Sequence, residues 1–136
     1  MKKNLTISAA CLINNQGEIL LVRKRGTTKF MQPGGKPEIG ESPLQTVIRE
    51  ISEELGISFM PDELKFDGEW IGAAANEDDT SIRASLFSAH YDGKLVPLAE
   101  LEELLWIAPK DALLREDIAP LLREFVLPHA IANAAG

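Results

Sequence analysis

The stretch GKPEIGESPLQTVIREISEELGI, residues 35–57, carries signals for one helix with defined ends. Ser42 is a favourable N-cap, and the proline after it suits the first helical position, where its missing N–H breaks no helical hydrogen bond. Gln45 lies three residues after Ser42 and completes a capping-box pattern. Gly56 suits the left-handed residue that commonly ends a helix. The sequence therefore predicts a helix over residues 43–55.

The predicted helix has an apolar stripe and a cluster of carboxylates. The apolar residues recur at i, i+3, i+4 and i+7 spacing, which predicts a face packed on the core: Leu44, Val47, Ile48, Ile51 and Leu55. Glu50 precedes Glu53 by three residues and Glu54 by four, so the three glutamates share a face. Like charges repel at this spacing, and the helix dipole is also negative at this end. A Mg²⁺ ion would remove that repulsion, and a solvated acidic face is the alternative interpretation.

The spacing of the charged residues and glycines is more specific than the carboxylates alone. Gly35 precedes Glu41, and Glu41 precedes the Arg49-Glu50, Glu53-Glu54 and Gly56-Ile57 pairs at the offsets of every fixed position of the Nudix box. The chain thus resembles the Nudix hydrolase family, and its size and N-terminal layout are similar to the MutT-type small members. The resemblance implies one Nudix domain over residues 1–136, with the box at 35–57.

Outside the box, runs of β-forming residues alternate with turn signals. Cys11 lies in an apolar run and is expected in the core. The elements expected from these patterns are strands at 5–13, 18–23, 66–76, 81–91 and 105–108, an acidic connector at 97–104, a short helix at 109–114, and a second amphipathic helix from near Asp117 to just before Pro128. Strands on both sides of a central helix predict an α/β fold, and the resemblance implies an α/β/α sandwich with a mixed sheet between helices.

Charge and length exclude several function classes. The 136 residues carry a net charge of −7, with a pI near 4.8, which argues against binding to nucleic-acid polymers or to anionic membranes. No apolar run approaches transmembrane length, and the basic N-terminus leads directly into a strand pattern instead of a signal peptide. We therefore expect a cytoplasmic protein. The resemblance implies a small nucleotide as the substrate, and we expect a monomer or a homodimer.

The resemblance also implies roles for individual residues. Mg²⁺, with Mn²⁺ as a possible substitute, is expected on Glu50, Glu53, Glu54 and the carbonyl of Gly34, and Glu53 is also a candidate for the general base. Arg49 is expected to orient a box carboxylate, and Glu41 to brace the loop or help bind the metal. The remaining candidates are Glu100 as a distant catalytic glutamate (ahead of Glu102 and Glu103), Arg23 as a substrate-binding arginine, and Asn76 as a reader of the base or a turn amide.

One position departs from the family pattern. Many relatives have a leucine before the proline that leads into the box, and this chain has Gln32.

The resemblance implies hydrolysis of a phosphoanhydride bond in a nucleoside diphosphate linked to another group. A nucleoside triphosphate, possibly with a modified base, is the first expectation, with a monophosphate and pyrophosphate as products. ADP-ribose, nucleotide sugars and dinucleoside polyphosphates are alternative substrates. A non-catalytic nucleotide-binding module is the alternative from another class, and the intact box argues against it.

Overall fold

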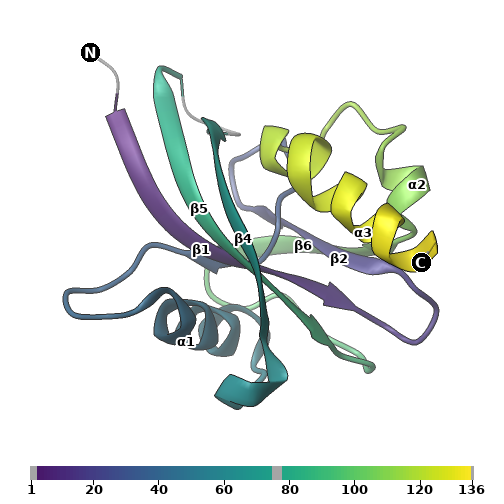
Figure 1. The fold of residues 1–136 in the computed structure, drawn as a ribbon, viewed down its shortest axis with the longest axis horizontal. Coiled ribbons are helices and arrows are strands. Elements are labelled where there is room, and N and C mark those ends of the chain that lie inside the picture. The colour runs from purple at the N-terminus through teal and green to yellow at the C-terminus, as the bar shows by residue number, and fades with distance from the viewer. Residues whose placement is uncertain (1–2, 75–77, 136) are drawn as a thin grey trace.

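The computed structural model describes residues 3–74 and 78–135, which form a mixed sheet with helices on both faces (Figure 1). The strands are β1 (Lys3–Ile13), β2 (Ile19–Lys24), β3 (Gly34–Gly35), β4 (Lys65–Ala73), β5 (Thr80–His90) and β6 (Leu101–Ile107). The helical segments are α1 (Pro43–Leu55), η1 (Pro61–Glu63), α2 (Pro109–Ala112), η2 (Leu122–Val126) and α3 (Leu127–Ala135). The predicted α/β class and the mixed sheet are confirmed.

Strand β1 is the centre of the sheet, whose order is β4-β5-β1-β2-β6. It runs parallel to β5 along its whole length, from the pair Lys3↔Thr80 to the pair Ile13↔His90. On its other edge it pairs with β2 only at Ile13↔Ile19. Nearer its N-terminus, Ser8 and Ala9 pair with the two glycines of β3. The sheet therefore divides beside β3, which contains Gly35, the first residue of the box.

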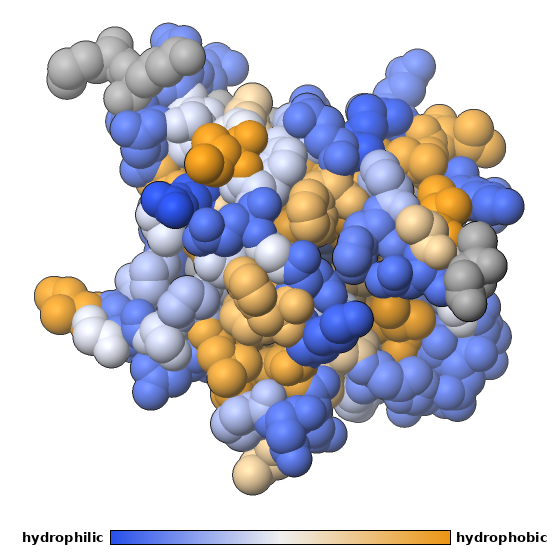
Figure 2. All heavy atoms as spheres, in the orientation of Figure 1, coloured by the Kyte–Doolittle hydropathy of each residue, from blue (hydrophilic) through white to orange (hydrophobic). Residues whose placement is uncertain are grey.

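Each face of the sheet has its own apolar core. Val47, Ile51 and Leu55 of α1 are buried against one face, as the apolar stripe predicts. Leu122 and Leu127 of the C-terminal helical region are buried against the other face. Figure 2 shows mostly hydrophilic side chains on one surface of the molecule, with apolar side chains gathered over its middle, between α1 and the C-terminal helix.

The box helix has the ends that the sequence predicts. The Ser42 hydroxyl accepts a hydrogen bond from the Gln45 N–H at 3.1 Å, and the Gln45 side chain accepts one from the Ser42 N–H at 2.9 Å. Gly56 adopts a φ of 72°, and its N–H donates to the Ser52 carbonyl. A complete capping box and a left-handed C-cap therefore fix where α1 begins and ends.

Two predicted boundaries are wrong. Strand β6 begins at Leu101, inside the stretch expected to be an acidic connector. Leu101 is buried, and the two glutamates that follow it are exposed. The C-terminal helix does not end before Pro128 but continues through it to Ala135. A π-helical turn, η2, precedes this proline, and such a widened turn is one of the ways a helix accommodates a residue without an N–H.

No helix within residues 3–74 and 78–135 combines the length and the apolar character that crossing a membrane requires.

Candidate active site

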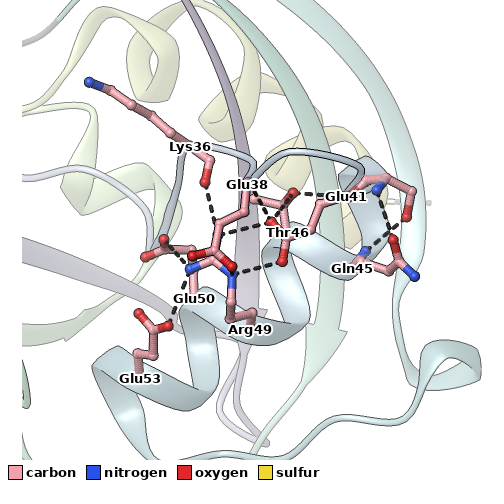
Figure 3. Close-up of polar contacts among 9 residues, drawn as sticks. Lys36, Glu38, Glu41, Gln45, Thr46, Arg49, Glu50 and Glu53 are labelled. Carbon is pink, nitrogen blue, oxygen red and sulfur yellow. Dashed lines mark hydrogen bonds and ion pairs between the residues drawn. The ribbon is translucent and has the colours of Figure 1, made fainter.

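Arg49 is the centre of a polar network at the start of the box helix (Figure 3). Its Nε and Nη2 atoms both donate to the Glu41 carboxylate, at 2.7 and 3.0 Å. Its Nη1 donates to Glu50 at 2.9 Å and to Glu53 at 3.2 Å, and its Nη2 also donates to the Lys36 carbonyl at 2.9 Å. One guanidinium therefore ties the loop before α1 to two box glutamates on the helix.

Glu41 has an environment that favours its charged form. The Arg49 guanidinium is the main cause, followed by the Glu38 N–H, and together they lower the pKa of Glu41 to about 2. The Thr46 hydroxyl donates a further hydrogen bond to Glu41 at 3.1 Å. Glu41 thus stays ionised and binds the Arg49 guanidinium through two hydrogen bonds.

Glu54 has the opposite environment. Its side chain is 1% exposed, and its Oε1 atom accepts a hydrogen bond from the Gly34 N–H at 3.0 Å. Its Oε2 atom has no hydrogen-bond partner among the described residues. Burial is the main cause that raises the pKa of Glu54 to about 8, since a carboxylate charge is costly in a dry site. A buried carboxylate oxygen without a partner fits a metal ligand.

The two glycines of β3 allow this strand to lie between β1 and the box helix. Gly34 has a φ of 151°, and a Cβ atom there would lie 2.1 Å from the Ser8 carbonyl oxygen. A Cβ atom on Gly35 would lie 2.5 Å from the Glu50 carboxylate carbon. A side chain at Gly34 would push β3 away from β1, whereas one at Gly35 would displace the Glu50 carboxylate.

The oxygen donors of this region suit a hard divalent cation. Glu50 and Glu54 lie one turn apart on α1, and burial is the main cause that raises the pKa of Glu50. Across residues 3–74 and 78–135, no group of three or more His, Cys, Asp or Glu side chains converges as a ready-made metal site. Arg49 holds Glu50 and Glu53, whereas Glu54 faces Gly34. After burial, repulsion from neighbouring carboxylates also raises the pKa of Glu50 and of Glu54.

A cleft of about 540 Å³ opens beside Glu50 and both glycines of β3. Lys24, Lys36 and Glu100 also line it, and the Lys24 ammonium lies 3.1 Å from the Glu100 carboxylate. Apolar side chains also line it, namely Leu5, Ile7, Ala9, Ile82 and Leu121. The cleft therefore combines charged side chains with apolar surface.

The structure separates the three glutamates of the stretch that was expected to be an acidic connector. Glu100 borders the cleft with Glu50, whereas Glu102 and Glu103 both bind the Arg23 guanidinium on the β2–β6 ladder. Arg23 is not among the residues that line this cleft, and its substrate-binding role stays a prediction. Its neighbour Lys24 lines the cleft, and the β2–β6 pairing is irregular between these two residues.

Two further residues bear on the site. Asn76 lies outside the described residues. Gln32 is buried and borders the cleft. In the sequence, the only sign that this position is unusual is that many relatives have a leucine there.

Comparison with known proteins agrees with this arrangement. The family model "NUDIX domain" matches residues 2–127. The 8-oxo-dGTP diphosphatase of Escherichia coli K12 is 40% identical over 60 residues, which are 41% of this chain and 46% of that protein. The uncharacterized Nudix hydrolase orf19 of Rhodococcus erythropolis is 31% identical over 124 residues, 76% of this chain and 63% of that protein.

The matches thus span roughly half to two thirds of the length of these relatives. The crystal structure of a MutT protein from Methanosarcina mazei Go1 has the same fold, with a TM-score of 0.82 and 23% identity over 99% of this chain and 98% of that one. The box geometry, the fold and the family match lead to one conclusion: the chain belongs to the Nudix family.

Proposed function

We propose that the protein is a pyrophosphohydrolase that cleaves a phosphoanhydride bond in a nucleoside diphosphate linked to another group. A nucleoside triphosphate is the first candidate, with a monophosphate and pyrophosphate as products. The observation that carries the proposal is the buried Glu54 oxygen without a partner, one helical turn from Glu50 at the edge of a cleft lined by lysines. The similarity to the E. coli 8-oxo-dGTP diphosphatase supports the substrate class.

The donor set fits Mg²⁺, with Mn²⁺ as a substitute. Glu50, Glu53, Glu54 and the carbonyl of Gly34 would hold the ion, all through oxygen atoms. When bound, the ion neutralises phosphate charge and lowers the pKa of water. Arg49 would keep Glu50 and Glu53 oriented toward the loop, and Glu41 would keep Arg49 in place through two hydrogen bonds.

The cleft residues would position the substrate for attack by water. Lys24 and Lys36 would bind phosphate oxygens as point charges. A water oxygen forms a bond to phosphorus while the bridging P–O bond breaks, and the water proton passes to Glu53 or Glu100. Glu100 lies with Glu50 on the cleft, which supports it as the base.

A screen that detects the monophosphate and pyrophosphate products by chromatography tests the proposal with Mg²⁺ and, separately, with Mn²⁺. The panel contains natural and oxidised nucleoside triphosphates, ADP-ribose, nucleotide sugars and dinucleoside polyphosphates, and a Glu54→Gln variant runs beside the wild type. We expect metal-dependent turnover of nucleoside triphosphates that the variant loses. Turnover of another class would replace the substrate, whereas nucleotide binding without any turnover would replace the enzyme by a binding module.

A further inference from the structure

Gln32 is a buried amide without a partner. It lies directly before Pro33 and the glycines of β3, and it is 5% exposed. Neither its Oε1 nor its Nε2 atom has a hydrogen-bond partner among the described residues. Burial of an unpaired amide costs free energy, and a buried polar group in a native protein usually has a protein, water or ligand partner. A partner from outside the chain is therefore expected at this position.

Gln32 differs from the other polar residues that line the cleft. Lys24 and Glu100 bind each other, and the Glu50 carboxylate accepts from Arg49. The Thr27 hydroxyl donates to the Lys24 carbonyl at 2.8 Å. Among the described lining residues, Gln32 is the buried one that keeps both a donor and an acceptor free.

The surroundings of Gln32 suit a flat, mostly apolar ligand group. The cleft it borders is lined by Glu50 and by apolar side chains, namely Leu5, Ile7, Ala9, Ile82 and Leu121. Phosphates require charged partners, whereas a nucleobase requires apolar surface and a few hydrogen bonds. Only Pro33 separates Gln32 from Gly34, which donates to Glu54, and both line this cleft, so one ligand would extend from the box to the amide.

We propose that the Gln32 carboxamide is a specificity-determining group that reads the edge of a nucleobase. A carboxamide presents an N–H donor and a C=O acceptor side by side, and it pairs with a base edge that has an acceptor next to a donor. A site built for such an edge rejects a ligand that lacks it, since the buried amide would then stay unpaired. This inference rests on the proposed function and adds how that same cleft recognises its nucleotide.

Water is the competing partner. Gln32 also borders a smaller cavity of about 250 Å³ beneath the C-terminal helix, where Cys11, Asp67 and His129 are among the lining residues. Ordered water in that cavity would satisfy the amide and leave base recognition unaffected. The two partners predict different effects of removing the amide on a nucleotide, and a substrate without a base serves as the reference.

The test compares Gln32→Met with the wild type on two substrates. Methionine keeps the length and lack of branching of glutamine but forms no amide hydrogen bonds. We expect kcat/KM for the best nucleoside triphosphate to fall about tenfold. Hydrolysis of inorganic tripolyphosphate, which has no base, should stay unchanged. The Tm should be retained, since the substitution removes a buried amide that has no hydrogen-bond partner in the chain.

Thr27→Val is the matched control, since it removes a polar group from the same cleft that already has a partner in the chain. It should leave the ratio of the two rates as in the wild type.

Equal loss on both substrates in Gln32→Met, or no loss on either, would overturn the inference and leave the proposed hydrolase activity unaffected. If the wild type turns over no nucleotide, the proposed function fails by itself. The inference is then decided by calorimetric binding of a non-hydrolysable nucleotide and of tripolyphosphate, where only nucleotide binding should weaken in Gln32→Met.

Discussion

The two ends of the box helix place chemically identical side chains in opposite environments. Glu41, in the loop that α1 follows, accepts two hydrogen bonds from Arg49, and its pKa is about 2. Glu54, in the last turn of α1, is buried with one donor, and its pKa is about 8. The motif spacing determines where each carboxylate lies, whereas water access and hydrogen-bond donors determine whether it carries charge.

The largest expected effect follows removal of the inner carboxylate. Glu54→Gln should lower metal-dependent turnover by at least about 100-fold. The loss of a metal ligand costs more activity than the loss of a group that only hydrogen-bonds to a ligand. In a chelator the same variant should have a higher Tm than the wild type, since it contains no carboxylate to bury. Adding Mg²⁺ should raise the Tm of the wild type only. Equal metal stabilisation of both proteins would contradict Glu54 as a ligand.

The next effect concerns the strand that supplies the donor to Glu54. Gly34→Ala should lower the free energy of unfolding by about 3 kcal/mol, because its Cβ atom would collide with the Ser8 carbonyl of β1. Gly40→Ala is the control: Gly40 also has a positive φ, 82°, but a Cβ atom there meets no atom within 4 Å. Urea denaturation should give a loss of about 1 kcal/mol for this control. Similar losses for both variants would contradict the role of close approach.

A smaller effect is expected at the outer network. Arg49→Lys keeps the charge but loses the planar guanidinium that binds Glu41 through two nitrogens, so we expect a loss of about 1 kcal/mol in stability. Turnover should fall about tenfold if Arg49 orients Glu50 and Glu53. Steady-state kinetics and urea denaturation on the same samples measure both quantities. Unchanged turnover with reduced stability would limit Arg49 to bracing the loop.

The two carboxylates should give opposite dependences of stability on pH in the metal-free protein. The folded pKa of Glu41 is below its ordinary value of 4.5, so its stabilisation is present above pH 4.5 and is lost as the pH falls toward 2. The folded pKa of Glu54 is above 4.5, so the fold loses stability as the pH rises from about 4.5 to 8. Urea denaturation across this range, with Glu41→Gln and Glu54→Gln as references, should show each slope disappear in its own variant.

The smallest effect is expected at an ion pair away from the box. Arg83 and Glu69 on β5 and β4 lie 3.3 Å apart, and both side chains are well exposed. Arg83→Ala should change the free energy of unfolding by no more than about 0.5 kcal/mol, because water screens such a pair. A loss as large as that of Arg49→Lys would contradict the expectation that an exposed ion pair contributes less to stability than the Arg49 network does.

Local rules explain what could be predicted from the sequence. The ends of α1 depend on Ser42, Gln45 and Gly56, whose preferences act within a few residues, and all three behave as expected. The start of β6 and the continuation through Pro128 depend on partners distant in the sequence, namely β2 and the apolar core beneath η2. Local propensity cannot detect these partners.

The same limit applies to the site. The box spacing indicates Glu50, Glu53 and Glu54 as candidates, but not that Arg49 holds two of them while the third faces Gly34. Arg23 and Lys24 are neighbours of the same charge, and only the pairing of β2 with β6 decides which one faces Glu102 and Glu103. Gln32 needed the structure, because an amide is notable only when it is buried without a partner.

The parallel pairing of β1 with β5 also sets the order in which the site assembles during synthesis. Gly34, the donor to Glu54, is held by β1, and β1 pairs along its whole length with residues 80–90. The capped box helix can therefore form soon after it leaves the ribosome, but its inner carboxylate gains its place only once β5 has emerged. Contacts so distant in the sequence close slowly, so the surroundings of Glu54 should be among the last parts of the domain to become ordered.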